Sequence, residues 1–167
     1  MDEQARKTAL RMSPYGIYVM TAEADGSAPA AATVNWVTQT SFSPPLVAIG
    51  VKTDSGVYAA TRASGHFVLN MLGKGQQGQA FTFFKPAELA DGKLSGEEIG
   101  RAANGAPILK CAPAAIECRL LEVVELGDHH TFIAEVTDVH LERVPEGRPD
   151  EAILEMKDLG ERVFYGG

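Results

Sequence analysis

Two long segments of β character dominate the second half of the sequence, Ala114 to Leu126 and His130 to Val144, separated by Gly127-Asp128. A Gly-Asp pair suits the positive φ angles of a tight turn, so we expect the two segments to form an antiparallel hairpin. The apolar alternation changes phase within each segment, for example at Leu120-Leu121. Such shifts indicate β-bulges, which a small closed barrel needs in order to curve. The hairpin therefore predicts a mainly antiparallel β-barrel.

The rest of the chain fits this fold class. Two short helices are predicted, at residues 56–63 with Ser55 as N-cap and at residues 76–84. Residues 85–105 resemble a long loop, and residues 152–156 are expected to add a last strand. No linker or repeat is present, so residues 1–167 are expected to form a single domain. Four further strands are predicted from alternation and turn signals, at residues 15–22, 31–39, 46–52 and 66–72.

Composition excludes several classes of protein. The net charge is −7 and no cluster of Lys and Arg is present, which argues against a nucleic-acid partner. The charged start of the chain lacks the apolar core of a signal peptide, and the longest apolar run, 46–51, is too short to span a membrane. Cys111 and Cys118 lie about 20 Å apart on an extended strand, so reduced thiols and a cytoplasmic location are expected.

Residues 33–55 are the segment whose side chains are best suited to bind a ligand. A strand rich in amides and hydroxyls is followed by a Pro-Pro turn and a buried strand, whose end brings Lys52 and Ser55 to the start of a helix. Free N–H groups at a helix start and a nearby lysine can bind a phosphate, while the polar strand can hydrogen-bond a heteroaromatic ring. The plainer alternative is that Ser55 only caps the helix and Lys52 is a solvated strand end. Asp54 would repel a phosphate unless its side chain points away.

Three blocks of sequence together resemble the flavin reductase family of FMN-binding split barrels. They are Ala32-Thr33-Val34-Asn35 through Ser41-Phe42-Ser43-Pro44-Pro45-Leu46-Val47, Gly65 to Leu72, and Gly127-Asp128-His129. The resemblance extends from about Ser13 to Val144. The opening Tyr15 to Thr21 is similar to the branch that contains flavoredoxin-like reductases.

The resemblance implies a split β-barrel of Greek-key type and a homodimer with one FMN per subunit near the dimer interface. It implies that His129 lies near the nicotinamide and the flavin ring, where it would act in catalysis. Departures from the family pattern at His130, Thr131 and Ala134 bear on the choice of substrate more than on flavin binding. The cofactor-binding residues carried over from the family are Thr33, Val34, Asn35, Trp36, Thr38 and Gln39 for the ring and ribityl chain, Lys52, Thr53 and Ser55 for the phosphate, and Phe84 and Lys85.

The implied activity is an NAD(P)H-dependent flavin reductase, with NADH or NADPH as the donor and FMN, or alternatively FAD, as the flavin. Electrons would pass to free flavin, a monooxygenase partner or a small iron protein. Two alternatives stay open. One is an FMN electron carrier that a partner protein reduces, and the other is a split barrel that has lost flavin.

Two other patterns carry less weight. None of the four histidines has metal-ligand spacing with another, so no metal site is predicted. Gly73-Lys74-Gly75-Gln76-Gln77-Gly78 matches the dinucleotide-binding Gly-x-Gly-x-x-Gly pattern, but the second parallel strand of such a fold is missing after it. The glycines are better explained as a flexible loop, with a lid over the flavin as one role for it.

Overall fold

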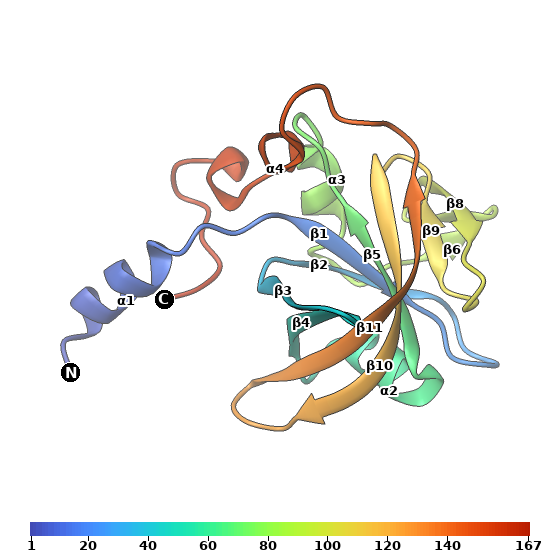
Figure 1. The fold of residues 1–167 in the computed structure, drawn as a ribbon, viewed down its shortest axis with the longest axis horizontal. Coiled ribbons are helices and arrows are strands. Elements are labelled where there is room, and N and C mark those ends of the chain that lie inside the picture. The colour runs from blue at the N-terminus through green and yellow to red at the C-terminus, as the bar shows by residue number, and fades with distance from the viewer.

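The computed structural model describes residues 1–167, and it confirms a mainly β fold with few short helices. A curled seven-stranded sheet forms the body in the order β2-β1-β5-β10-β11-β4-β3 (Figure 1). A separate four-stranded sheet, β6-β7-β8-β9, lies beside it. No helix has the length and apolar character needed to cross a membrane. The strands of the large sheet are β1 Tyr18–Ala22, β2 Ala30–Val34, β3 Val37–Phe42, β4 Pro45–Lys52, β5 His66–Met71, β10 Ala114–Val124 and β11 His129–Leu141.

The long hairpin predicted from the sequence is the centre of the large sheet. β10 pairs with β11 in antiparallel register, and the pairing shifts between Glu117 and Cys118 and again between Leu120 and Glu122. The second shift falls at the phase change seen in the sequence. β11 also pairs with β4, and β10 pairs with β5, so both long strands are internal to the sheet.

One predicted strand, residues 31–39, is wrong as a single element. The chain leaves the sheet at Asn35-Trp36, and the two halves become β2 and β3 at opposite edges. β2 pairs only with β1, whereas β3 pairs only with β4. The alternating pattern continues through Asn35-Trp36, so no local signal marks this break. The break opens the side of the barrel where β2 faces the end of β4.

Other differences lie in the connections. Residues 85–105, expected to be a loop, contain most of the small sheet, and residues 152–156 form only isolated bridges at Ile153 and Glu155 in place of a strand. An unpredicted helix begins the chain, capped by the Asp2 carboxylate, and it buries none of its residues. The remaining elements are α1 Glu3–Arg11, α2 Gly56–Ser64, α3 Gln77–Thr82, β6 Leu89–Ala90, β7 Lys93–Leu94, β8 Glu97–Arg101, β9 Pro107–Leu109, α4 Pro149–Ala152 and the 3₁₀ helix η1 Met156–Leu159.

Two apolar clusters hold the elements in place. The first fills the barrel and includes Ile49, Phe67 and Phe132, all fully buried. The second includes Phe83 and Leu154 and joins the large sheet to α3, the small sheet and the C-terminal segment. Burial of large apolar side chains is the main stabilising term in a fold of this size. The second cluster therefore fixes the segment after α3 against the open side of the barrel.

A buried carboxylate ties the small sheet to the long hairpin. Glu117 on β10 accepts hydrogen bonds from the backbone N–H groups of Ala103 (3.0 Å) and Asn104 (3.3 Å), and from His140 Nε2 at 2.8 Å. Asp138 brings a second carboxylate to the same cluster. The Glu117 oxygens thus have protein donors, and its role is to anchor the turn after β8.

Candidate functional site

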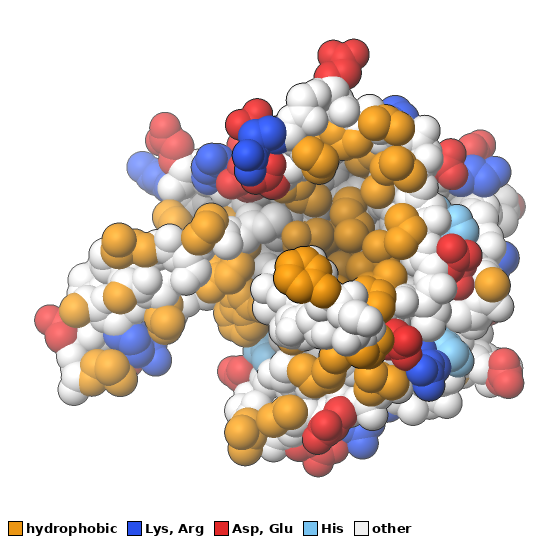
Figure 2. Space-filling view, in the orientation of Figure 1, with side chains coloured by type: hydrophobic (Ala, Val, Ile, Leu, Met, Phe, Trp, Pro, Cys, Tyr) orange, Lys and Arg blue, Asp and Glu red, His pale blue; other side chains and the backbone are white.

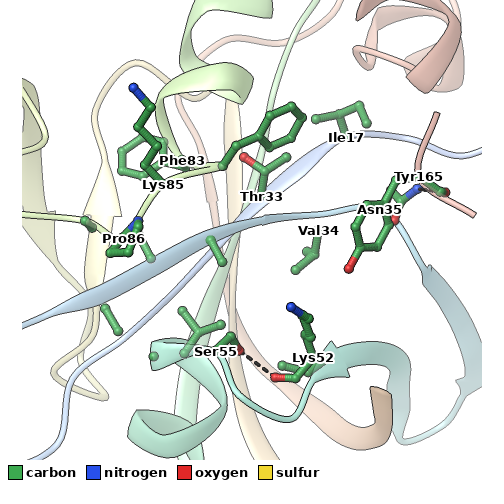
Figure 3. A pocket seen from close by; sticks show the side chains of 18 of the residues that line it. Ile17, Thr33, Val34, Asn35, Lys52, Ser55, Phe83, Lys85, Pro86 and Tyr165 are labelled. Carbon is green, nitrogen blue, oxygen red and sulfur yellow. Dashed lines mark hydrogen bonds between the residues drawn. The ribbon is translucent and has the colours of Figure 1, made fainter. Parts of the chain in front are cut away.

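A cavity of about 820 Å³ opens where the barrel is split. Its walls come from β2, the end of β4, the start of α2, residues 83–87 after α3, and the C-terminal residues 163–165 (Figure 3). This volume lies in the range of cofactor pockets. The long-range placement of these five segments is therefore what makes the site.

The first turn of α2 forms one end of the cavity. Ser55 caps the helix, as predicted: its hydroxyl accepts from Tyr58 N at 3.3 Å and donates to Lys52 O at 2.7 Å. Gly56 and Val57 follow it and line the cavity. The first N–H groups of a helix have no partner inside the helix and lie at the positive end of its dipole. This end of the cavity is suited to an anion.

Two lysines line the cavity and differ in their partners. Lys52 Nζ lies 3.3 Å from Asp54 Oδ1, and both side chains are more than half exposed. In Figure 3 the Lys52 ammonium points into the space between Val34 and Ser55, whereas the Lys85 ammonium points away from Ser55. Lys85 has no carboxylate within ion-pair distance. Asp54 is the one acidic residue in the lining, so its charge offsets only Lys52.

An aromatic cluster borders the cavity beside Lys52, because His129 on β11 is the cross-strand partner of Lys52 on β4. The His129 side chain is 14% exposed, and its Nδ1 lies 2.8 Å from Asp128 Oδ1 while its Nε2 lies 2.7 Å from the Tyr165 hydroxyl. The Trp36 ring lies 4.7 Å from the His129 ring and 5.4 Å from the Tyr165 ring, centroid to centroid. Buried Asn35 donates from Nδ2 to the Tyr165 carbonyl at 3.0 Å.

The electrostatics of this cluster fix the roles of the two imidazole nitrogens. The hydrogen bond from His129 lowers the pKa of Asp128, so its carboxylate stays ionised and accepts from Nδ1–H. Burial raises the pKa of the Tyr165 hydroxyl, which keeps its proton. With Nδ1 protonated, a neutral His129 accepts from Tyr165 at Nε2. Asp128 therefore orients the imidazole so that Nε2 meets the Tyr165 hydroxyl at the cavity wall.

The structure brings most of the predicted residues together but leaves others apart. Trp36 lies beside the cavity through its contact with His129. Thr38 and Gln39 are exposed on the edge strand β3, because the chain crosses to the other edge after Trp36. Half-buried Thr53 bonds to the Asp128 carbonyl through its N–H and its hydroxyl. The predicted residues in the lining are Thr33, Val34, Asn35, Lys52, Ser55, Phe84, Lys85 and His129.

Sequence reasoning missed the C-terminal residues and misplaced a loop. Val163, Phe164 and Tyr165 line the cavity, although only the aromatic pair Phe164-Tyr165 near the chain end hinted at it. Residues 73–78 do not line the cavity, so the lid role considered for them is wrong. Lys74 instead binds Asp158 at 2.6 Å and Glu155 at 3.3 Å. The glycine-rich loop therefore anchors the C-terminal segment.

Comparisons with known proteins agree with this geometry. The chain is 31% identical over 136 residues to the stachydrine N-demethylase reductase subunit Stc3 of Rhizobium meliloti, covering 81% of this chain and 58% of that protein. It is 30% identical over 141 residues to the NADH:FMN oxidoreductase of Rhodococcus qingshengii, covering 84% of this chain and 71% of that protein. The styrene monooxygenase flavin reductase of Pseudomonas putida S12 superposes with a TM-score of 0.70 at 28% identity, covering 81% of this chain and 86% of that one.

Some relatives are considerably longer than this chain. It spans 58% of the Stc3 protein and 24% of a diflavin flavoprotein of Synechocystis that is 32% identical over 139 residues. The match to the flavin reductase like domain extends over residues 10–156, which include every strand and all but the last residues of the cavity wall. The chain belongs to the flavin reductase like domain family.

Proposed function

We propose that this chain is an NAD(P)H-dependent flavin reductase that holds FMN in the cavity between β2 and α2. The single observation that carries this proposal is that one cavity brings together an anion-binding helix start, a lysine and an oriented histidine. When bound there, FMN supplies the ring that accepts a hydride and passes electrons on. The proposed site residues are those carried over from the family that line the cavity, together with Trp36.

The residues present fit the phosphate and the ring of a flavin. The unpaired N–H groups at the start of α2 and the Lys52 ammonium would hold the phosphate. Apolar wall residues such as Val34 and Val57 would pack against a flat ring. Asp54 is the feature that fits least well, because it shares Lys52 with the phosphate.

His129 is proposed to position the nicotinamide. It lines the cavity and Asp128 holds its orientation, so its Nε2 is placed to hydrogen-bond a polar group of the donor in place of the Tyr165 hydroxyl. An imidazole at this place can also act as a general acid or base toward the reduced site. Thr38, Gln39 and Thr53 lie outside the cavity, and we propose no contact between them and the flavin.

FMN is proposed as the flavin over FAD because the anion-binding groups are gathered at one end of the cavity, as a single phosphate needs. One relative is the reductase component of a 4-nitrophenol monooxygenase, and one solved structure is a styrene monooxygenase flavin reductase, which supports a monooxygenase as the electron acceptor. All of this is proposed for a single domain formed by residues 1–167.

A homodimer is also proposed. Figure 2 shows hydrophobic side chains gathered in a hollow over β1, β5, β10 and β11. Exposed Val139 and Leu141 on β11 add to the apolar surface of the chain. An apolar surface of this kind is typical of an interface, and a second copy of the chain would cover it.

The proposal is tested by loading the purified protein with FMN and adding NADH or NADPH without oxygen. Saturable bleaching of the flavin absorbance is expected with at least one donor. His129→Ala should slow bleaching at least about tenfold with the Kd for FMN changed less than about twofold. Lys110→Ala, which removes an exposed charge outside the cavity, is the matched control. An FMN-loaded protein that neither donor bleaches would favour the electron carrier, and a protein that takes up no FMN would end both proposals.

A further inference from the structure

The last residues of the chain form a strap across the part of the cavity beside Trp36 and His129, which we call the ring end. On one side, η1 is tied to the loop after β5 by the ion pairs of Lys74 with Glu155 and Asp158. On the other side, Arg11 Nε donates to Gly166 O at 3.1 Å, and its guanidinium lies 4.5 Å from the centre of the Phe164 ring. We call residues 160–167 the C-terminal strap. Its two anchors hold Tyr165 between them, at the mouth of the cavity.

Tyr165 occupies the groups that a substrate would need. Its hydroxyl is hydrogen-bonded to His129 Nε2, and its carbonyl accepts a hydrogen bond from the side-chain amide of Asn35. Its ring contacts the Trp36 ring. In Figure 3 its ring hangs over Lys52, with the hydroxyl directed into the cavity. The Tyr165 ring therefore lies where the proposed function places the nicotinamide ring of the donor.

We propose that Tyr165 is an access-controlling residue: the C-terminal strap closes the ring end of the cavity, and Tyr165 has to leave His129 before a flat heteroaromatic substrate can enter. The substrate is the nicotinamide of the donor or the ring of an exchanging flavin, which share the same shape and chemistry. This inference rests on the proposed function of the cavity and of His129.

The contacts of the C-terminal strap suit a segment that opens. Phe164 and Tyr165 remain 53% and 46% exposed, and none of residues 160–167 is buried. Segments with few buried apolar contacts open at low free-energy cost, and such segments supply the lids of binding sites. Arg11, which holds the end of the strap, belongs to a helix that buries none of its own residues. The closed position is therefore held by a few contacts at the surface, among them the hydrogen bond between Tyr165 and His129, which we call the latch.

Two variants separate the effect of the hydrogen bond between Tyr165 and His129 from the effect of the Tyr165 ring. Tyr165→Phe removes the hydrogen bond to His129 and keeps the ring, whereas Tyr165→Ala removes both. We expect Tyr165→Ala to lower the KM for the reduced nicotinamide at least about threefold without lowering kcat for FMN bleaching, and Tyr165→Phe to fall between it and the wild type. Phe42→Ala is the matched control, because Phe42 is 92% exposed and lies outside the cavity.

Trypsin reports the position of the strap directly, because exposed Arg162 precedes the residues that line the cavity. Mass spectrometry would follow the release of residues 163–167 from the full chain. NAD⁺ added to the FMN-loaded protein should speed this cleavage severalfold if the nicotinamide displaces Tyr165, and FMN added to the flavin-free protein should do so if the flavin ring displaces it. Tyr165→Ala should be cleaved fast without either ligand.

The outcomes distinguish this inference from the proposed function. If NADH bleaches the wild-type protein but the KM is unchanged or raised in Tyr165→Ala, the proposed reductase activity stands and the access-controlling role of Tyr165 is refuted. A kcat that falls at least about tenfold in Tyr165→Ala also refutes it, because Tyr165 would then belong to the working site. Cleavage that neither ligand changes refutes it as well.

Discussion

The pairing of Lys52 with Asp54 allows the phosphate contact to be tested with a calculated magnitude. A charged group hydrogen-bonded to a phosphate contributes about 1.5–3 kcal/mol. Lys52 already shares its charge with Asp54 at 3.3 Å, and an exposed pair of this kind is worth about 0.2–1 kcal/mol. The net loss on Lys52→Ala should then be about 0.5–2.8 kcal/mol, which raises the Kd for FMN about 2- to 100-fold.

Riboflavin provides the control, because it carries the same ring and ribityl chain without the phosphate. Fluorescence titration with each ligand should show that Lys52→Ala weakens FMN and leaves riboflavin within about twofold. Asp54→Asn removes the competing carboxylate and should tighten FMN by up to about fivefold, again without changing riboflavin. If Lys52→Ala weakens both ligands equally, or neither, the phosphate does not lie at the start of α2 and the orientation proposed for the flavin is wrong.

Three further predictions concern the protein around the cavity. Glu117→Ala should lower the free energy of unfolding by about 2–4 kcal/mol, measured by urea denaturation, because it leaves two backbone N–H groups and His140 without their acceptor. Burial raises the pKa of Cys111 and of Cys118 to about 12, so both thiols stay protonated at pH 8; iodoacetamide should modify them at least about 100-fold more slowly in the folded than in the unfolded protein. Gly50→Ala would place a methyl group 3.0 Å from Trp36 Cε3, so the emission of this sole tryptophan should shift, and an unchanged spectrum would contradict the packing.

The parts of the fold that were predictable are those with local signals. The start of α2 follows from Ser55 and the residues after it, and the central hairpin follows from Gly127-Asp128 between two alternating segments. The break between β2 and β3 was not predictable, since alternation continues through Asn35-Trp36 and only tertiary pairing sends the halves to opposite edges. The small sheet was missed because three of its strands have only two or three residues, too few to show an alternating pattern, and its longest strand, β8, is mostly polar.

The site divides in the same way. Lys52 ends a predicted strand and Ser55 begins a predicted helix three residues later. Their closeness in the cavity was therefore predictable from the sequence. Tyr165 reaches His129 from 36 residues further along the chain, and no periodicity encodes that contact. Thr38 and Gln39 were assigned to the flavin by the family resemblance, but they lie on β3 beyond the crossing at Trp36 and outside the cavity lining.

The split between β2 and β3 makes ligand occupancy part of the stability of the whole sheet. The two walls of the cavity that β2 and β4 provide are connected within the sheet only through four intervening strands. A flavin in the cavity would join these walls directly, acting as a non-covalent crosslink across the open seam. At a free flavin concentration 100 times its Kd, binding to the folded state alone adds about 2.7 kcal/mol to the free energy of unfolding. The concentration of free flavin would then determine how long the folded protein resists heat and proteolysis, in addition to its rate of catalysis.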